Sequence, residues 1–132
     1  SVSLYDKPNI DEYRDVTFNI GKLAVKSSRK NIATERTELY KLMGRYYWLV
    51  KKQKRALKWW DLSIKEGLHL GAKIELSRSY FEVGKRLFED SSKYPELNGL
   101  NAKEYLIKAK GLFEELDLQH DLEQFERVST RL

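Results

Sequence analysis

Side chains that commonly carry catalysis are few and scattered in this sequence of 132 residues. It contains no Cys, which excludes cysteine nucleophiles, thiolate metal sites and disulfides. The two histidines, His69 and His120, are 51 residues apart, and neither stands in the His-x-x-x-His spacing of a metal site. We interpret both as ordinary residues near helix ends, and we expect neither a metal nor a cofactor.

Glycines and carboxylates do not indicate an active site either. Gly67 and Gly71 lack the Gly-Lys-Ser/Thr sequence of a phosphate-binding loop. We expect them instead to stop one helix and restart the next. Six acidic residues near the C-terminus are spaced around a helix, as on a solvated face, and they are Glu114, Glu115, Asp117, Asp121, Glu123 and Glu126. The sequence therefore predicts a protein that is not an enzyme.

Basic residues are concentrated in the first half of the chain. Residues 1–66 hold 15 basic and 8 acidic side chains, whereas residues 67–132 hold 10 and 12. Such an excess attracts nucleic-acid phosphates or another anionic surface. The alternative is a solvated turn between two helices, because no base-reading element accompanies the cluster. The cluster, which peaks between two hydrophobic stretches, consists of Lys51, Lys52, Lys54, Arg55 and Lys58.

Hydrophobic residues recur at steps of three and four along most of the chain, which is typical of helices. We predict about six, over residues 10–27, 32–50, 53–65, 72–89, 101–113 and 118–132. Asn101 and Glu104 predict a capping box at the start of the fifth. Turns are expected over residues 6–9 and 91–99. Because alternating hydrophobic residues flank neither turn, the sequence predicts no strand and an all-α class.

The chain repeats itself at a shift of 40 residues, which aligns Tyr40 with Tyr80 and Gly44 with Gly84. Glycine inside a helix is less favourable than alanine by roughly 0.5 to 1 kcal/mol, so its recurrence at one phase indicates a packing requirement. We predict that each glycine lets two antiparallel helices approach closely. The positions predicted for this packing are Tyr40, Gly44, Ala56, Trp60, Tyr80, Gly84 and Ala102.

Two runs share one pattern: Tyr40-x-x-Met43-Gly44-x-x-Tyr47 with Ala56-x-x-x-Trp60, and, more loosely, Tyr80-x-x-Val83-Gly84-x-x-Leu87 with Ala102-x-x-x-Leu106. The pattern resembles the tetratricopeptide repeat, although the period is about 40 residues rather than 34. The resemblance covers residues 35–113. It implies that residues 1–132 form a single domain of stacked antiparallel helical hairpins, an α-solenoid, in which residues 10–27 are the second helix of a preceding unit.

Residues 70–87 together with residues 112–122 also resemble the closing repeats of large bacterial signalling proteins built around a cyclase, kinase or ATPase domain. With Ser1 rather than Met at the start, this implies a fragment of a larger cytoplasmic protein. The function implied is non-catalytic: binding a partner segment, or docking on a catalytic domain and regulating it. No apolar run approaches the roughly 18 residues of a membrane span, so no membrane partner is expected.

In stacked hairpins of this family the first helices line a concave groove, which the resemblance implies to be the partner-binding surface. Cations beside aromatic rings suit an acidic, aromatic or C-terminal-carboxylate segment. The groove positions are Lys41, Arg45, Trp48, Arg78, Phe81 and Lys85, with Phe88 nearby. The alternative is that the aromatic residues pack between hairpins.

The partner expected is a protein, a peptide or another domain of the same protein, and a homodimer is a further expectation. The alternative function is a nucleic-acid-binding helical module that uses the basic cluster at residues 51–58. A small-molecule pocket between hairpins is a third interpretation.

Overall fold

The computed structural model describes residues 6–30 and 33–130. Helices make up most of this part of the chain, which confirms the all-α class. They are α1 (Asp6–Lys30), α2 (Ala33–Leu49), α3 (Gln53–Leu70), α4 (Lys73–Phe88), α5 (Ala102–Glu115) and α6 (Gln119–Ser129). Residues 32, 131 and 132, which fall within two of the predicted helices, lie outside the described residues. No helix in the described ranges is long and apolar enough to span a membrane.

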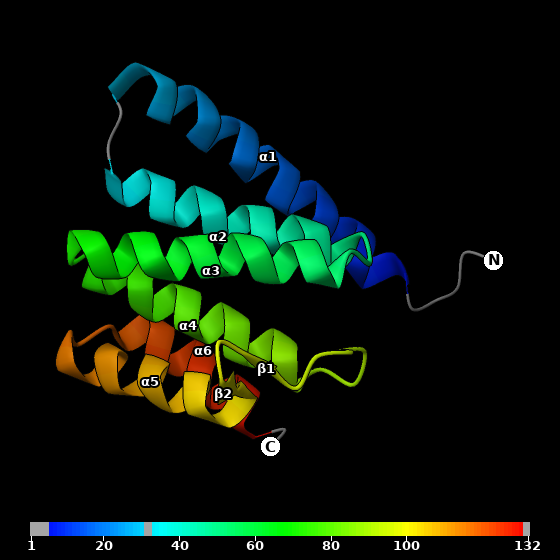
Figure 1. Cartoon of the computed structure of the whole chain (residues 1–132), viewed down its shortest axis with the longest axis vertical. Helices are drawn as coiled ribbons and strands as arrows, with labels where there is room; N and C mark the ends of the chain where they lie inside the picture. The colour runs from blue at the N-terminus through cyan, green and yellow to red at the C-terminus, as the bar shows by residue number, and fades with distance from the viewer. Residues whose placement is uncertain (1–5, 31–32, 131–132) are drawn as a thin grey trace.

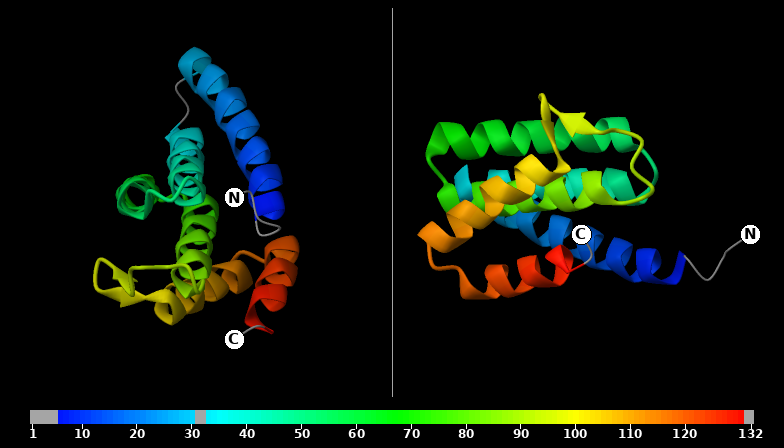
Figure 2. Two further views of the ribbon diagram at one scale, coloured as in Figure 1. Left: turned by 90° about the vertical axis from the view of Figure 1, so that its right-hand side faces the viewer. Right: turned by 90° about the horizontal axis from the view of Figure 1, so that it is seen from below.

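The helices form stacked antiparallel hairpins. The most extensively packed pairs are α2 with α3 and α4 with α5, and Figure 1 shows the two pairs one above the other. In Figure 2, α2 and α4 form a central row, with α3 and α5 on one side and α1 and α6 on the other. We call the side of α2 and α4 that faces α1 and α6 the inner face.

The repeated glycines lie where the helices of each hairpin come closest. A Cβ atom at Gly44 would stand 2.2 Å from Nε1 of Trp60, and one at Gly84 would stand 2.8 Å from Cγ of Leu106. Trp60 is fully buried, and its Nε1 donates a hydrogen bond to the carbonyl oxygen of Lys41 over 3.1 Å. Both glycines therefore make the close helix contacts that the 40-residue repeat predicts.

The other predicted packing positions lie around these contacts. Ala56 is fully buried, and Tyr80 is buried with its ring centroid 5.9 Å from that of Tyr105. Tyr40 is half-buried, and its ring centroid is 5.7 Å from that of Trp59. Ala102 contributes its carbonyl oxygen, 3.0 Å from where a Gly84 Cβ would be. Each set of positions thus gathers at the contact between two consecutive helices of one hairpin.

The turn between α3 and α4 differs from the prediction. Helix α3 does not stop at Gly67 but continues to Leu70, because Gly67 is buried and lets α4 approach: a Cβ there would lie 3.2 Å from Cβ of Leu76. The stop is Gly71 alone, in the left-handed conformation with φ 64°. Its N–H donates to the carbonyl oxygen of Leu68. This conformation favours glycine because it has no Cβ.

Replacing Gly71 with alanine is expected to lower the free energy of unfolding by about 1 kcal/mol, since alanine is strained at this φ. Thermal denaturation of the two proteins checks this. Gly71→Asn serves as the matched variant, because asparagine tolerates the left-handed region and should restore part of the loss. An alanine variant as stable as wild type would contradict the assignment of Gly71 as the helix stop.

The segment between α4 and α5 contains two short strands, so the prediction of no strand is wrong. Strands β1 (Glu96–Leu97) and β2 (Leu100–Asn101) pair antiparallel. Asn98 and Gly99 between them both have positive φ, the geometry of the tight turn for which Asn-Gly is the favoured sequence. The hydroxyl of Tyr105 donates to the carbonyl oxygen of Leu97 over 2.6 Å and fastens this hairpin to α5. The capping box of Asn101 and Glu104 is confirmed.

Helix α1 also departs from the prediction, at its start and in its position. It begins at Asp6 rather than Ile10, because a proline in the first turn, here Pro8, loses no helical hydrogen bond. It does not continue the layer of α3 and α5 but lies on the inner face with α6 (Figure 2). The fully buried Val16 anchors it there. The interpretation of this segment as the second helix of a preceding unit is therefore wrong.

Candidate functional site

Three of the six predicted groove residues are not on an open surface. Lys41, Trp48 and Phe81 are at most 9% exposed. The ring centroid of Trp48 is 5.4 Å from that of Trp60, and that of Phe81 is 5.8 Å from that of Phe113. The expectation that these side chains face a partner is wrong, because neighbouring helices cover them. Trp48 and Phe81 thus pack against the second helix of their own hairpin, whereas Phe88 is exposed, so the alternative of packing between hairpins does not hold for it.

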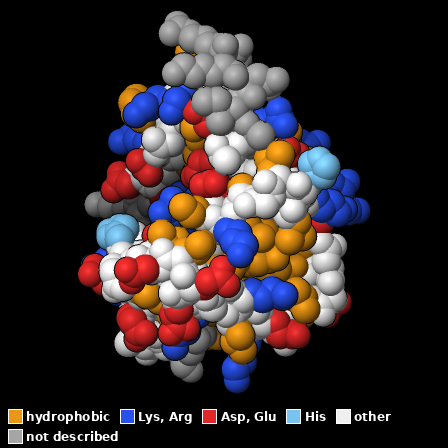
Figure 3. All heavy atoms as spheres, turned by 90° about the vertical axis from the view of Figure 1, so that its left-hand side faces the viewer, with side chains coloured by type: hydrophobic (Ala, Val, Ile, Leu, Met, Phe, Trp, Pro, Cys, Tyr) orange, Lys and Arg blue, Asp and Glu red, His pale blue; other side chains and the backbone are white. Residues whose placement is uncertain are grey.

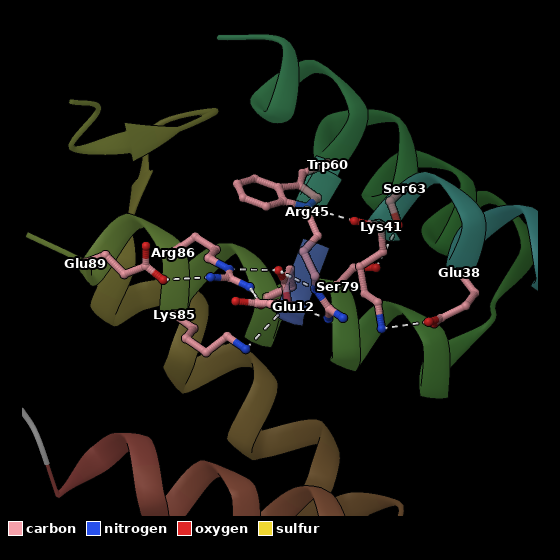
Figure 4. A network of polar contacts seen from close by, with 11 residues as sticks. Glu12, Glu38, Lys41, Arg45, Trp60, Ser63, Ser79, Lys85, Arg86 and Glu89 are labelled. Atoms are coloured by element: carbon pink, nitrogen blue, oxygen red, sulfur yellow. Dashed lines mark hydrogen bonds and ion pairs between the residues drawn. The ribbon is translucent and has the colours of Figure 1, made fainter. Parts of the chain in front are cut away.

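Two of the other groove residues converge on a buried carboxylate that the sequence analysis missed. Glu82 of α4 is 2% exposed. Arg45 of α2 donates to it twice, from Nε to Oε2 over 3.1 Å and from Nη2 to Oε1 over 2.8 Å. Arg86 donates from Nε to Oε2 over 3.0 Å, and Nζ of Lys85 lies 3.6 Å from Oε1. Figure 4 shows these cations around one point on the inner face.

Charge attraction outweighs burial at Glu82. Burial alone would raise the pKa of this carboxyl, whereas Arg45, Lys85 and Arg86 lower it, and the resulting pKa is well below its ordinary value. Attraction to Glu82 in turn raises the pKa of Arg45. Glu82 also attracts Lys85, but burial and repulsion by Arg86 and Arg45 together lower the pKa of the Lys85 ammonium. Lys85 is therefore the least well compensated cation of the group.

Arg86 connects this group to a second helix and a distant part of the chain. Its Nη1 donates to Oε2 of Glu89 over 2.9 Å, and its Nη2 donates to Oε1 of Glu12. Glu12 belongs to α1, 74 residues earlier in the chain. Helix α1 therefore supplies a carboxylate to the inner face. We call Glu12, Arg45, Glu82, Lys85, Arg86 and Glu89 the Glu82 network.

The remaining groove residue, Arg78, is also paired within the chain. It donates from Nε and Nη2 to the two carboxylate oxygens of Asp121 over 2.9 and 3.1 Å. This contact joins α4 to α6. The prediction that Asp121 lies on a solvated face is wrong, because Asp121 is buried. No cluster of three or more His, Asp or Glu able to hold a metal ion occurs within residues 6–30 and 33–130.

Two cavities border the contact between Glu12 and Arg86. The larger has a volume of about 970 Å³ and the smaller about 610 Å³, and both are lined by Glu12, Arg86 and Glu89. The smaller one is also lined by Lys85, Phe88, Asp90 and Val128. Phe88 is 44% exposed, so an apolar surface lies beside the cations of the inner face.

All five residues of the predicted basic cluster line the larger cavity, together with Lys93 from the loop after α4. We call this space the basic cavity. Arg55 lies over the ring of Tyr47, 5.7 Å from its centroid. Among the residues that the structure describes, none of the six cations has a carboxylate oxygen within 4.0 Å.

Hydrogen bonds hold the wall of the basic cavity in place. The side chain of Gln53, at the start of α3, donates to the carbonyl oxygen of Ser91 over 2.9 Å and accepts from the backbone N–H of Lys93 over 2.8 Å. Nε1 of Trp48 donates to Oε1 of Glu89 over 2.9 Å. The loop that carries Lys93 is thereby fixed against the α2–α3 turn.

The side of the molecule that carries the α3–α4 turn, across from the basic cavity, has a different surface. Figure 3 shows this face, where hydrophobic side chains gather in one area and basic and acidic side chains are interspersed around it. The α3–α4 turn and the start of α4 expose Leu68, Leu70 and Ile74. Among the charged residues near this end, Lys73 and Glu115 pair over 3.1 Å. The charged side chains on this face are thus of both signs, unlike the six cations, unpaired among the described residues, that line the basic cavity.

Comparison with protein-family models, curated proteins and solved structures finds no match for this chain. The resemblance to the tetratricopeptide repeat therefore stays a prediction that rests on its residues. The candidate sites are the inner face with the Glu82 network and the basic cavity beside it.

Proposed function

We propose that the chain is a non-catalytic protein-interaction module of the tetratricopeptide kind, which binds an acidic segment on its inner face. The segment belongs to a partner protein or to another domain of a larger cytoplasmic signalling protein that the module regulates. The observation that carries the proposal is the contact between Glu12 and Arg86. Here the inner face already binds a carboxylate that comes from α1, outside the two central hairpins. A carboxylate of a partner segment could bind Arg86 in the same way.

The charge balance of the Glu82 network favours a carboxylate ligand. Arg45, Lys85 and Arg86 supply three positive charges, and Glu82 and Glu89 supply two negative charges from α4 and its C-terminal end. The third negative charge comes from Glu12. If a partner carboxylate replaces Glu12, the balance is retained, and Arg86 keeps a charge-assisted hydrogen bond.

The smaller cavity beside the Glu82 network favours a partner segment that also carries an apolar side chain. Phe88 and Val128 line the smaller cavity next to Lys85 and Arg86. A segment with an acidic residue beside a leucine or phenylalanine would satisfy both surfaces at once. Lys85 is the cation that such a segment reaches most readily, because its side chain is 31% exposed whereas that of Arg86 is 6% exposed.

Peptide binding to wild type, Glu12→Gln and Lys85→Met tests the proposal. The probe is a short fluorescent helical peptide with acidic residues on one side and Leu and Phe on the other. We expect Glu12→Gln to bind it roughly fivefold or more tightly, because the competing carboxylate is gone, and Lys85→Met to bind it more weakly. Fluorescence anisotropy at low and moderate salt gives the affinities.

The matched control is Glu123→Gln, which removes an exposed negative charge from α6 and leaves the inner face unchanged. Its affinity should equal that of wild type, and a scrambled peptide of the same composition should bind all proteins weakly. Equal affinities for Glu12→Gln, Glu123→Gln and Lys85→Met would contradict a carboxylate site on the inner face.

A further inference from the structure

The basic cavity has a charge composition that the proposed peptide-binding function does not use. Seven cations and two carboxylates line it. Both carboxylates, Glu12 and Glu89, accept hydrogen bonds from Arg86. Neither of them pairs with any of the six other cations. Some lysines elsewhere pair with carboxylates, as Lys41 does with Glu38 and Lys65 with Asp61, whereas none of these six cations does so among the described residues. The basic cavity therefore gathers positive charge that the described part of the chain does not neutralise.

Two of these cations lie in the first turn of α3, where positive charge is unfavourable for the helix. Helices α2, α4, α5 and α6 each carry an acidic residue in the first turn, and these are Glu35, Glu75, Glu104 and Asp121. Helix α3 has none, and Lys54 and Arg55 occupy its first turn. Positive side chains at a helix N-terminus oppose the helix dipole. Lys54 and Arg55 are both exposed, so the burial of α3 does not require positive charge at these two positions.

The cavity is a preformed hollow rather than a row of independent lysines. Gln53 fixes the Lys93 loop to the start of α3. Lys51, in the turn after α2, has the left-handed conformation, with φ 67°, and its N–H donates to the carbonyl oxygen of Trp48 over 3.1 Å. The volume of about 970 Å³ lies at the upper end of the range of small-molecule sites. Cations from two segments thus converge on one half-open hollow.

We propose that the basic cavity binds a compact ligand that carries two or more phosphate groups, such as a nucleoside polyphosphate or an inorganic polyphosphate. Several phosphates within one small ligand match several cations around one hollow, through charge-assisted hydrogen bonds from lysine and arginine. The aromatic side chain of Tyr94, which also lines the cavity, offers an apolar contact for a base. A nucleic acid is the competing ligand, but a hollow with cations converging from two segments favours a compact anion over an extended strand.

Calorimetric titration of the whole chain tests the proposal. The probes are inorganic tripolyphosphate, magnesium-free ATP, orthophosphate and a single-stranded oligonucleotide, all at the same ionic strength. Tripolyphosphate and ATP should bind, and orthophosphate should bind at least roughly tenfold more weakly because it engages fewer cations. Tighter binding of ATP than of tripolyphosphate would assign the site to a nucleotide, whereas equal binding would assign it to the phosphate chain alone; both support the proposal.

The test variant is Lys52→Glu with Lys54→Glu, and the control is Lys22→Glu with Lys103→Glu, which makes the same change in net charge on exposed positions of α1 and α5. We expect the test variant to bind tripolyphosphate roughly tenfold or more weakly and the control less than about twofold more weakly. Acidic residues at the start of α3 complement the helix dipole. The test variant should therefore melt at or above the wild-type temperature, which separates lost binding from unfolding.

Three outcomes would overturn the proposal. The first is equal weakening by the test and control variants, which would show attraction to net charge only. The second is that orthophosphate binds as tightly as tripolyphosphate. The third is that the oligonucleotide binds more tightly than tripolyphosphate and gains affinity with length, which would assign the basic cavity to nucleic acid.

Discussion

Replacing Gly44 with alanine is expected to lower the free energy of unfolding by about 2 to 4 kcal/mol. The new methyl group would lie 2.2 Å from Nε1 and 2.3 Å from Cδ1 of Trp60. The indole cannot move aside easily, because it is fully buried and is held by its hydrogen bond to the carbonyl oxygen of Lys41. Overpacking of this kind typically costs 1 to 3 kcal/mol, and the lost hydrogen bond adds about 1 kcal/mol. Chemical denaturation at neutral pH measures the loss.

The same substitution at two other helical glycines provides the controls. Gly84→Ala would place its Cβ 2.8 Å from Cγ of Leu106 and 3.0 Å from the carbonyl oxygen of Ala102, and we expect a smaller loss because these contacts are less close than the 2.2 Å contact at Gly44. Around Gly111 of α5 there is nothing within 4 Å of an added Cβ. Gly111→Ala should therefore raise stability by roughly 0.5 to 1 kcal/mol through helix propensity. Stability at or above wild type in Gly44→Ala would contradict the close contact between α2 and α3.

The sequence predicts the hairpins well because their signals are local or repeated. Hydrophobic spacing identifies the helices, and the recurrence of Gly44 at Gly84 identifies their contact points. The spacing follows from the burial of one helix face, and the recurrence follows from the requirement that a helical glycine be compensated by packing. The turn at Asn98 and Gly99 falls within the turn predicted over residues 91–99, but the strands beside it were not predicted, although this dipeptide favours a tight hairpin. Each of these strands is two residues long, which is too short for an alternation of hydrophobic and polar residues to be visible.

The candidate site was predicted less well, for a physical reason. Cations beside aromatic residues on one helix face indicate a binding surface only if no carboxylate of the chain reaches them. The spacing of Glu82 from Lys85 and Arg86 was a usable signal, because residues three and four apart share a helix face. Glu12 had no such signal. Hydrophobic periodicity shows that α1 buries one side but does not show which helices it covers, so the contact with Arg86 could be found only in three dimensions.

The basic cavity shows the reverse case, in which sequence proximity identified a real cluster. Lys51 to Lys58 are neighbours in the chain, and they stay neighbours because the turn between α2 and α3 is short. Lys93 was missed because it joins them through the bonds of Gln53 to the loop after α4. The cavity itself depends on that loop. A cluster that is continuous in sequence could therefore be predicted, whereas the shape of the hollow that it lines could not.

Neutralising the buried carboxylate with Glu82→Gln is expected to lower the free energy of unfolding by about 3 to 5 kcal/mol at neutral pH. The substitution keeps the shape of the side chain but leaves Arg45 and Arg86 without their central partner. The matched control is Glu115→Gln, whose contact with Lys73 joins two exposed side chains and should be worth at most about 1 kcal/mol. The double variant Glu82→Gln with Arg45→Gln should recover part of the loss, because it removes one cation together with the carboxylate.

Acid denaturation separates the charge of Glu82 from its shape. The pKa of Glu82 is lower in the folded chain than its ordinary value of 4.5, so the unfolded state binds the proton more tightly. The stabilisation is complete above about pH 4.5 and is lost as the pH falls toward the folded-state pKa. The difference in the free energy of unfolding between wild type and Glu82→Gln should therefore narrow as the pH falls below about 4.5. A difference that stays constant with pH would mean that the glutamine acts through packing, and that the three cations are not held by the ionised carboxylate.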